Sequence, residues 1–201
     1  MLHRKERLIK ATIEIIDQFG ILELTTKEIA KREKVSEATL FRHFASKNEL
    51  LKAVLDYFSE FDDEIFLSAK SKGLKPTKTI IYLIQLYIEY YQANHEITSI
   101  MQLIEVFRYN PDLKEKVKSI FYNRSYHIKQ LVEDAQKAGE ISSDIDSESI
   151  TNVISGFCRE TCLKWRIEDQ KFLSKDKILS TLEFFLDGFS VNQTDNNGGP
   201  L

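Results

Sequence analysis

The sequence predicts an all-α protein, and three observations support this fold class. Only 7 of the 201 residues are glycine and only 3 are proline, and these are the residue types that interrupt helices most strongly. Apolar residues recur at helical spacing along most of the chain. Three helix starts with hydroxyl caps fall between residues 25 and 46. We therefore expect an N-terminal three-helix head of the helix-turn-helix type, joined to a larger C-terminal helical domain, with about nine helices in all.

The first helix is expected over residues 3–19. Leu8, Ile15 and Phe19 belong to one apolar stripe with helical spacing. Gly20 follows directly, and glycine is the residue most often found just beyond a helix end. The pattern predicts an amphipathic helix with a defined stop.

Two short helices are expected next, separated by a tight turn. Thr25 caps the first of them, and Glu28 lies three residues later, at the spacing of a capping box. Ser36 caps the second, where Val35 and Leu40 have the spacing of a hydrophobic staple that sets the angle of entry. These signals predict the two helices of a helix-turn-helix unit.

A fourth helix is expected to begin after Ser46, with Glu49 again in capping position, and to continue to about Lys72. Ser147 and Ser174 are cap candidates for the last two helices of the remainder. The remaining helices are expected over residues 76–93, 95–108, 111–138, 147–168 and 175–189. The chain then divides into a head over residues 1–46, a helical body over 47–189 and a polar tail over 190–201 that we expect to be disordered.

The composition, 42% apolar and 29% charged, is typical of a soluble globular protein. The apolar runs are too short to span a bilayer, and the N-terminus lacks the apolar stretch of a secretory signal. We expect a cytoplasmic protein with no membrane partner. Cys158 and Cys162 lie four positions apart on an expected helix, and two small buried apolar residues are the favoured interpretation over a metal or redox pair.

Charge is distributed unevenly along the chain, although the net charge is only −3. Residues 1–52 contain 11 lysines and arginines against 8 aspartates and glutamates, whereas the rest of the chain contains 17 against 23. A basic head on an acidic body is typical of a protein that touches nucleic-acid phosphates with one end.

The second helix of a helix-turn-helix unit enters the major groove, and its N-terminal residues meet base edges. Here that helix covers residues 36–44, so Arg42 is expected on guanine or phosphate, and Thr39 and His43 on the DNA backbone. A surface lysine or arginine is usually only solvated, so the interpretation depends on the whole set. The expected DNA contacts are Arg4, Lys5, Thr26, Lys27, Ser36, Glu37, Ala38, Thr39, Phe41, Arg42, His43 and Lys47.

Residues 8–55 carry a pattern that covers about a quarter of the chain. It consists of Phe19-Gly20, Thr25-Thr26, Ile29-Ala30, Val35-Ser36, Thr39-Leu40-Phe41, His43-Phe44, Lys47 and Leu50-Leu51. In this pattern the region resembles the DNA-binding head of the TetR family of transcriptional regulators. Two positions depart from it: Ala38 stands where the family usually has Gly, and Phe41 stands where it usually has Tyr. Without the tyrosine hydroxyl, either one phosphate anchor is missing or the ring simply packs.

The resemblance implies a repressor that binds a pseudo-palindromic DNA operator as a homodimer and is released by a small-molecule effector. The body loosely resembles the branch that responds to long-chain fatty acyl-CoA, which implies a lipophilic effector of the fatty-acid or acyl-CoA class. A filled pocket would tilt the long fourth helix as a lever and change the spacing of the two heads.

The body offers candidate residues for both of these functions, although aromatic residues at helical spacing are more often core than ligand contacts. The ligand-binding candidates are Tyr87, Tyr91, Gln102, Glu105, Arg124, His127 and Thr161. The last two helices also have broad apolar faces that a partner subunit would cover. The dimer-interface candidates are Ile154, Phe157, Trp165, Leu182, Phe185 and Phe189.

No catalytic motif, cofactor site or metal site is expected, and we do not expect an enzyme. The sequence has no nucleophile elbow, phosphate-binding loop or zinc-protease motif, and its four histidines do not cluster. The alternative function is a helical dimeric protein-interaction module whose head does not read DNA. Salt-dependent binding to a palindrome separates the two, because phosphate contacts make affinity fall with salt.

Overall fold

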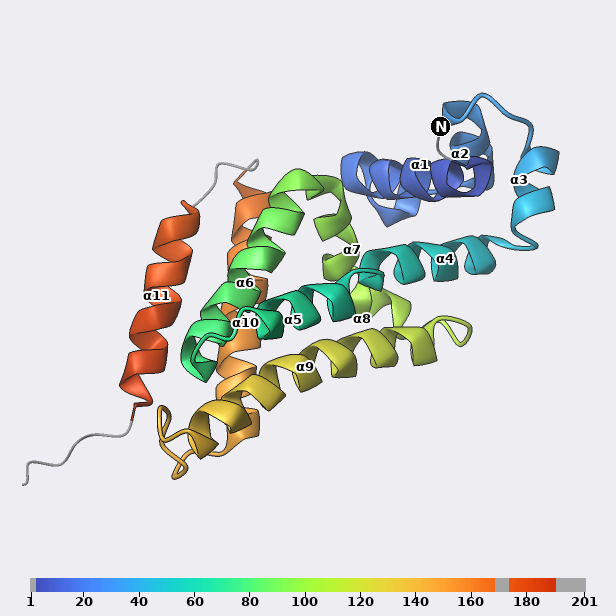
Figure 1. Ribbon diagram of the computed structural model, residues 1–201. Helices are drawn as coiled ribbons and strands as arrows, with labels where there is room; N and C mark the ends of the chain where they lie inside the picture. The colour runs from blue at the N-terminus through green and yellow to red at the C-terminus, as the bar shows by residue number, and fades with distance from the viewer. Residues whose placement is uncertain (1–2, 169–173, 191–201) are drawn as a thin grey trace, which may run out of the picture. The chain divides into compact units, whose positions relative to one another are not determined.

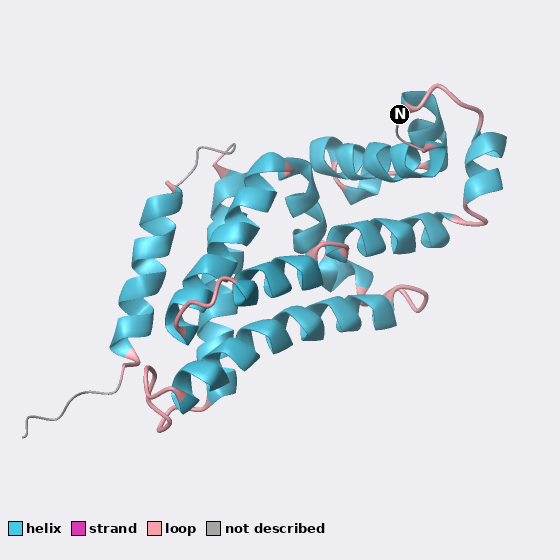
Figure 2. Cartoon of the chain, in the orientation of Figure 1, coloured by secondary structure: helices cyan, strands magenta, loops and turns pink. Residues whose placement is uncertain are grey.

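The computed structural model describes residues 3–168 and 174–190, and over these ranges all regular structure is helical (Figures 1 and 2). Eleven α-helices and two 3-10 helices lie in this described part, which confirms the all-α prediction. The tail expected to be disordered, residues 190–201, lies outside the described residues except for Ser190. None of the described helices is long and apolar enough to cross a membrane.

Two compact units divide the chain, one made of Met1–Glu64 with Glu89–Arg124 and the other of Ile65–Ile88 with Ser125–Leu201. We call them the first and the second unit. Three helices contribute residues to both units: α5 (Asp62–Ser71), α6 (Pro76–Ala93) and α9 (Lys114–Lys137). The predicted head therefore shares a compact unit with segments from much later in the chain.

The first unit contains most of the short helices. They are α1 (Arg4–Phe19), η1 (Ile21–Glu23), α2 (Thr26–Arg32), α3 (Glu37–His43), α4 (Lys47–Ser59), η2 (His95–Ile97), α7 (Thr98–Gln102) and α8 (Ile104–Phe107). The caps predicted for α2, α3 and α4 are all present. Thr25, Ser36 and Ser46 each accept a hydrogen bond from the backbone N–H three residues later, at 3.1, 3.2 and 3.1 Å. Each cap satisfies one of the helix's first N–H groups, which have no partner within the helix.

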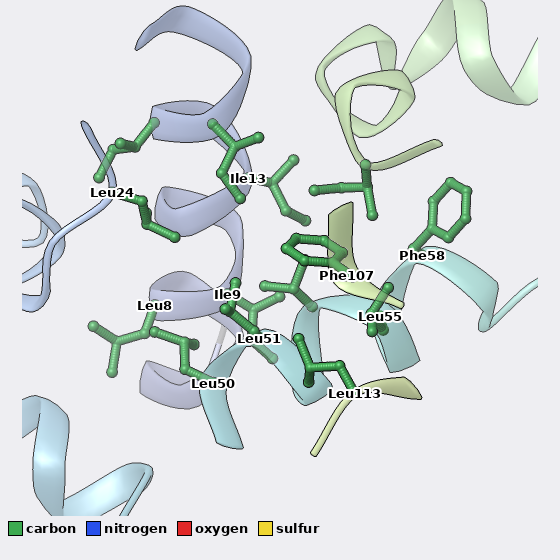
Figure 3. Packing of buried hydrophobic residues seen from close by; sticks show 14 of the residues in the cluster. Leu8, Ile9, Ile13, Leu24, Leu50, Leu51, Leu55, Phe58, Phe107 and Leu113 are labelled. Carbon is green, nitrogen blue, oxygen red and sulfur yellow. The ribbon is translucent and has the colours of Figure 1, made fainter. Parts of the chain in front are cut away.

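One apolar core joins the head to α7, α8 and the start of α9. Leu8 and Ile13 of α1 and Leu55 of α4 are buried in the same cluster as Ile100 of α7 and Phe107 of α8. Figure 3 shows Leu8, Ile13, Leu55 and Phe107 among the side chains of this cluster. Each fully buried leucine, isoleucine or phenylalanine contributes about 1.5–3 kcal/mol. The head is therefore stabilised in part by segments that lie more than 50 residues away in the chain.

The second unit is built from parts of α5, α6 and α9 together with α10 (Ser147–Ile167) and α11 (Lys175–Gly188). Its core includes Ile80 and Leu83 of α6, Leu131 of α9, Ile154 of α10 and Leu182 of α11. Ser174 caps α11 as predicted, since its side chain accepts from Lys177 N at 3.2 Å.

The long helix expected over residues 47–72 is broken, and this prediction was wrong. α4 ends at Ser59 and α5 begins at Asp62. The Ser59 hydroxyl donates to the Leu55 carbonyl at 3.0 Å, and Arg124 Nη2 donates to the Phe58 carbonyl at 3.3 Å. Because these carbonyls have side-chain donors, the backbone turns at this point instead of continuing the helix.

Three other boundaries differ from the sequence prediction. The helix expected over residues 95–108 is divided into η2, α7 and α8, and the one expected from residue 111 begins at Lys114. The Asn110 side chain accepts from Asp112 N at 3.0 Å and so forms a turn before α9. Asp146, rather than Ser147, caps α10, with its carboxylate accepting from Ser149 N at 2.9 Å. The Ser147 hydroxyl instead donates to Glu133 at 3.5 Å.

Candidate DNA interface

The helix α3 is anchored on one side and exposed on the other. Leu40 is fully buried within α3, and Phe44 is buried directly after it. Glu37, Ala38 and Arg42 are exposed. The hydrophobic staple therefore fixes the helix while it presents its other face to solvent, as reading of DNA requires.

Three polar side chains form a connected row along α3. Ser36 Oγ lies 3.0 Å from Thr39 Oγ1, and Arg42 Nη2 donates to Thr39 Oγ1 at 3.1 Å. The guanidinium carries four further N–H donors. This row pre-orients Arg42 on the exposed face while leaving it capacity for a base edge or a phosphate.

The first turns of α2 and α3 are joined by a side-chain hydrogen bond. Thr26, the first residue of α2, donates from Oγ1 to Glu37 Oε2 at 2.6 Å, and Glu37 is the first residue of α3. Sequence analysis placed both residues among the DNA contacts without predicting this bond. The bond ties together the two helices of the helix-turn-helix unit at its exposed edge.

Two of the predicted basic residues rest on the head itself. Lys47 Nζ donates to the Leu24 carbonyl, which fixes the start of α4 against the turn before α2. Lys5 Nζ lies 5.3 Å from the centre of the Phe44 ring, a cation–π distance. Both ammonium groups are thus positioned by contacts within the first unit.

The remaining predicted DNA residues differ in exposure. Arg4 and Lys27 are exposed at the first turns of α1 and α2. Phe41 is also exposed, so its ring is not part of the core. His43, the last residue of α3, is half-buried. All of these residues belong to the first unit.

Sequence analysis missed the contacts that hold the head in shape. Arg7 of α1 pairs with Glu33 at 2.9 Å, and Arg32 of α2 pairs with Glu14 of α1 at 3.0 Å. These two arginines stabilise the head by ion pairs within it. The residues next to a basic side chain do not show whether it will bind a DNA phosphate or a carboxylate of the protein. The roles of Arg7 and Arg32 could therefore not be predicted from the sequence.

A second missed contact connects α4 to the loop before α9. Asn48 Nδ2 donates to Asp112 Oδ2 at 2.6 Å, and Asn110 Nδ2 donates to Asn48 Oδ1 at 3.0 Å. Lys116 Nζ lies 2.6 Å from Asp56 Oδ1 further along α4. Sequence separations of about 60 residues hid these contacts, which attach α4 to later segments of the first unit.

Four of the ligand candidates lie in the first unit: Tyr91, Gln102, Glu105 and Arg124. The Gln102 side-chain nitrogen is buried without a hydrogen-bond partner. Arg124 Nε pairs with Asp62 at 2.7 Å. Glu105 is exposed and accepts from Arg108 at 2.9 Å, so it lies at the surface and not in the core.

Aromatic rings surround this part of the first unit. The rings of Tyr90 and Tyr91 are centred 5.5 Å apart, and Phe61 lies 5.7 Å from Tyr90. The Arg124 guanidinium stacks over Phe58 at 4.1 Å. Burial raises the pKa of Tyr90 well above its ordinary value, and the neighbouring Tyr57 and Tyr91 add to the shift. Tyr90 is thus a neutral hydrogen-bonding group in a largely apolar surrounding.

The other ligand candidates, Tyr87, His127 and Thr161, lie in the second unit. His127 is buried and stacks face to face on Phe66, with ring centres 4.1 Å apart and an interplanar angle of 1°. Tyr87 packs at the edge of the second core, and Thr161 is half-buried on α10. The structure thus divides the seven candidates between the two units.

The dimer-interface candidates also separate into two groups. Ile154 and Leu182 belong to the core of the second unit, and Trp165 is buried too, so a partner subunit cannot cover them further. Phe157 and Phe189 are half-buried, and Phe185 is partly exposed with its ring 5.8 Å from that of Phe157.

Other apolar side chains of α10 and α11 are exposed. Phe184 of α11 is 77% exposed, and Val153 of α10 is 44% exposed. Both lie on the helices for which a partner was expected. On these two helices Val153, Ile167, Phe184 and Phe185 are exposed and so available to a partner, whereas Ile154 and Leu182 are buried.

The two cysteines lie on α10 as expected. Burial raises the pKa of the Cys158 thiol to about 12, and nearby Cys162 adds to the shift. Both cysteines are half-buried. A thiol held in its neutral form behaves as a small apolar group. Across residues 3–168 and 174–190, no three His, Cys, Asp or Glu side chains are grouped to hold a metal ion.

Two family models match the chain. Residues 8–54 match the bacterial regulatory proteins of the tetR family, and residues 46–188 match the C-terminal region of YsiA-like proteins. The chain is 23% identical over 183 residues to the fatty acid metabolism regulator protein of Bacillus subtilis strain 168, covering 90% of this chain and 93% of the relative. It is 26% identical over 167 residues to the nucleoid occlusion factor SlmA of Aliivibrio fischeri strain MJ11, covering 78% and 83%.

Solved structures share the fold. The transcriptional regulator FadR from Bacillus subtilis, in complex with stearoyl-CoA, aligns with a TM-score of 0.80 at 22% identity, over 92% of this chain and 99% of that one. The ketosteroid transcriptional regulator KstR2 of Mycobacterium tuberculosis aligns with a TM-score of 0.79 at 15% identity, over 95% and 97%. The N-terminal and C-terminal family models together span nearly all of the described residues, and the C-terminal one alone covers well over half of the chain. The chain therefore belongs to the tetR family of bacterial regulatory proteins and is a transcriptional regulator, not an enzyme.

Proposed function

We propose that the protein is a repressor that binds a pseudo-palindromic operator as a homodimer and leaves it when a fatty-acyl ligand binds the body. The observation that carries this proposal is the exposed polar face of α3, which capped helices and a buried staple hold in place. On that face, Arg42 reads a base edge or a phosphate, and Thr39 supports it.

Basic residues on the helices next to α3 would bind the DNA phosphates. Arg4, Lys5, Lys27 and Lys47 supply positive charge from the first turns of α1, α2 and α4. Such contacts set the register of the head on the duplex, whereas groups on α3 distinguish the bases. The remaining predicted contacts, which include Phe41 and His43, would add to the fit between this surface and the DNA.

The effector proposal has two supports. The C-terminal region matches YsiA-like proteins, and one relative is named a fatty acid metabolism regulator. Structures of similar fold hold stearoyl-CoA and lauroyl-CoA. In this chain, the enclosed side-chain nitrogen of Gln102 is a donor that a ligand carbonyl would satisfy. Arg124 and Tyr91 provide further polar groups in the same unit.

The core of the first unit gives a route from such a ligand to the head. Gln102 ends α7, whose Ile100 is buried in the same cluster as residues of α1 and α4. A packed core transmits small shifts because its side chains cannot yield independently. A ligand seated at α7 would thereby move α1 and α4, and binding of ligand and DNA would oppose each other reciprocally.

The deciding experiment is a fluorescence anisotropy titration with an operator duplex obtained by selection from random DNA. We expect the affinity to fall steeply between 50 and 200 mM salt, by roughly 10³–10⁵ if about six to ten phosphates are contacted. Adding stearoyl-CoA or lauroyl-CoA should then weaken binding by about 5- to 150-fold, the usual range of allosteric coupling. Free coenzyme A is the matched control and should have little effect.

Each failure has a separate meaning. A protein that binds no DNA at any salt concentration would support the alternative, a helical interaction module with a head that does not read DNA. Steep salt dependence with no response to either acyl-CoA would keep the DNA-binding function and refute the fatty-acyl effector.

A further inference from the structure

Glu37 occupies an unusual place for an acidic side chain. It is the first residue of α3 and the only acidic residue of that helix, and like Arg42 it is exposed. A carboxylate on a DNA-reading surface is repelled by the phosphates on both sides of the groove. A side chain in this position therefore weakens binding to DNA in general unless a particular base sequence offsets the repulsion.

The structure holds this carboxylate in a defined position. Thr26 Oγ1 donates to Glu37 Oε2 at 2.6 Å, so the side chain is drawn toward the first turn of α2. A carboxylate has about four acceptor sites, and one hydroxyl donor leaves capacity for further donors. Pre-positioning of this kind lowers the entropy cost of forming a hydrogen bond with a base.

Only some base edges can satisfy an ionised carboxylate. In the major groove, guanine presents two acceptors and thymine presents an acceptor and a methyl group. Adenine presents an amine donor beside the N7 acceptor, which repels a second acceptor, whereas cytosine presents its N4 amine without N7. A carboxylate that only accepts hydrogen bonds is therefore best matched by cytosine.

We infer that Glu37 is a specificity-determining residue that accepts a hydrogen bond from the N4 amine of one cytosine in each operator half-site. The inference rests on the proposed DNA-binding function. Its electrostatic consequence is that Glu37 discriminates in two ways, by attracting cytosine at one position and by weakening binding to every other sequence.

The test compares base preferences instead of overall affinity. Operators are first selected from random DNA with the unaltered protein, and the affinity is then measured for duplexes that carry each of the four bases at every half-site position. At one position, replacing cytosine should weaken binding by about 5- to 150-fold, the usual value of a good side-chain–base contact. The Glu37→Ala variant should be nearly indifferent at that position and keep its preferences elsewhere.

The near-isosteric Glu37→Gln variant makes the sharper prediction. A glutamine amide both donates and accepts and pairs with adenine N6 and N7. The preferred base should therefore change from cytosine to adenine at the same position. Non-specific DNA should bind more tightly to this variant than to the unaltered protein, since one repelling charge is gone.

Thr26→Val provides the control for a merely structural role. It removes the hydrogen bond between the helices but keeps the carboxylate, so overall affinity should fall while the cytosine preference persists. If Thr26→Val and Glu37→Ala erase the same preference equally, Glu37 acts only by joining α2 to α3 and the inference is overturned. An unchanged base profile in Glu37→Gln overturns it as well. Failure of the unaltered protein to select any DNA would instead refute the proposed function.

Discussion

Lys34 stands in the left-handed region of backbone space, with φ of +54°, in the turn between α2 and α3. Its N–H donates to the Lys31 carbonyl at 3.1 Å, and the Val35 N–H donates to the Ala30 carbonyl at 2.9 Å. This pattern ends α2 and reverses the chain. A non-glycine residue in this region costs roughly 1–2 kcal/mol. The turn that separates the two reading helices is therefore held by the structure around it.

Replacing Lys34 by glycine should stabilise the protein. Relief of the backbone strain outweighs the larger entropy that glycine has in the unfolded chain, so the net gain should be about 0.5–1 kcal/mol. Urea unfolding followed by circular dichroism measures the change. Lys34→Ala is the control, because alanine keeps the strained conformation and should gain nothing. A Lys34→Gly variant that is less stable than Lys34→Ala would show that the turn carries no strain, because only the entropy cost of glycine would then remain.

The proposed roles of Arg42, at a base edge, and Lys47, at a phosphate, predict different responses to truncation. Arg42→Ala should cost about 1–3 kcal/mol on the selected operator and relax its sequence preference. Lys47→Ala should lower the affinity for every DNA sequence about equally. The slope of log affinity against log salt concentration should become shallower by about one, because one phosphate contact is lost. Anisotropy titrations on specific and random duplexes measure both effects. Lys118→Ala, an equal charge change on α9 at the Glu115 pair, should alter neither.

Arg124 contacts both sides of the break between α4 and α5. Arg124 Nε lies 2.7 Å from Asp62 Oδ2, and the Asp62 side chain is only 4% exposed. The same guanidinium covers the Phe58 ring and donates to its carbonyl. The lever suggested for the head is therefore the 13-residue α4, ending at Ser59, and not a helix that continues to residue 72.

Removing Arg124 should be strongly destabilising, because it leaves the buried Asp62 carboxylate without its ion-pair partner. Arg124→Met should cost roughly 3–5 kcal/mol in the free energy of unfolding. The double variant with Asp62→Asn should recover part of this loss, since no buried charge then remains. Denaturant unfolding of the two single variants and the double variant measures the coupling. Strictly additive losses would mean that the pair is not what holds the break.

The cap of α10 gives a pH-dependent prediction. The backbone N–H and the hydroxyl of Ser149 donate to Asp146 and lower the pKa of its carboxyl below the ordinary value. The ionised cap therefore stabilises the fold fully above the unfolded pKa of about 3.9, and this stabilisation is lost as the pH falls through the lower folded pKa. In Asp146→Asn, a cap that does not titrate, the melting temperature should decline less between pH 5 and about pH 3. Parallel melting curves for the two proteins would refute this role.

The elements predicted correctly are those whose signals are local. The caps at Thr25, Ser36 and Ser46 need only the next three residues, and each forms as predicted. The break after Ser59 was missed because its donor, Arg124, lies 66 positions from the Phe58 carbonyl that it binds. The cap of α10 was predicted at Ser147, one residue too late. The Ser147 hydroxyl donates to Glu133, so Asp146 caps the helix instead.

For the candidate DNA interface, too, only the local features could be predicted. Its members were predicted from a short run of residues, whereas the bond from Thr26 to Glu37 joins two helices across the turn. The dimer-interface candidates illustrate the limit most clearly. Helical spacing identifies an apolar face but does not divide it between the chain's own core, which takes Ile154 and Leu182, and the exposed side chains such as Phe184.

Assembly depends on what covers the exposed aromatic side chains of α10 and α11. Two heads held together are needed to bind two half-sites about 34 Å apart, and a single head would retain only one set of contacts. The second unit offers Phe184, 77% exposed, and Phe185, 39% exposed, on α11, and Val153, 44% exposed, on α10. Exposed apolar groups gathered on two helices are typical of a protein interface. We expect an isologous dimer centred on this surface.

Phe184→Asp should convert the dimer to a monomer, because a two-fold interface places two new buried charges close together. Sedimentation velocity at micromolar concentration should show half the mass, and operator affinity should fall by at least about tenfold, since each head then binds alone. Tyr122→Asp, on α9 and 66% exposed, is the matched control and should remain dimeric. If Phe184→Asp sediments as a dimer, the interface lies elsewhere. If it is monomeric yet binds the full operator with unchanged affinity, two-headed binding does not determine affinity, because the DNA itself would be bringing the two copies together.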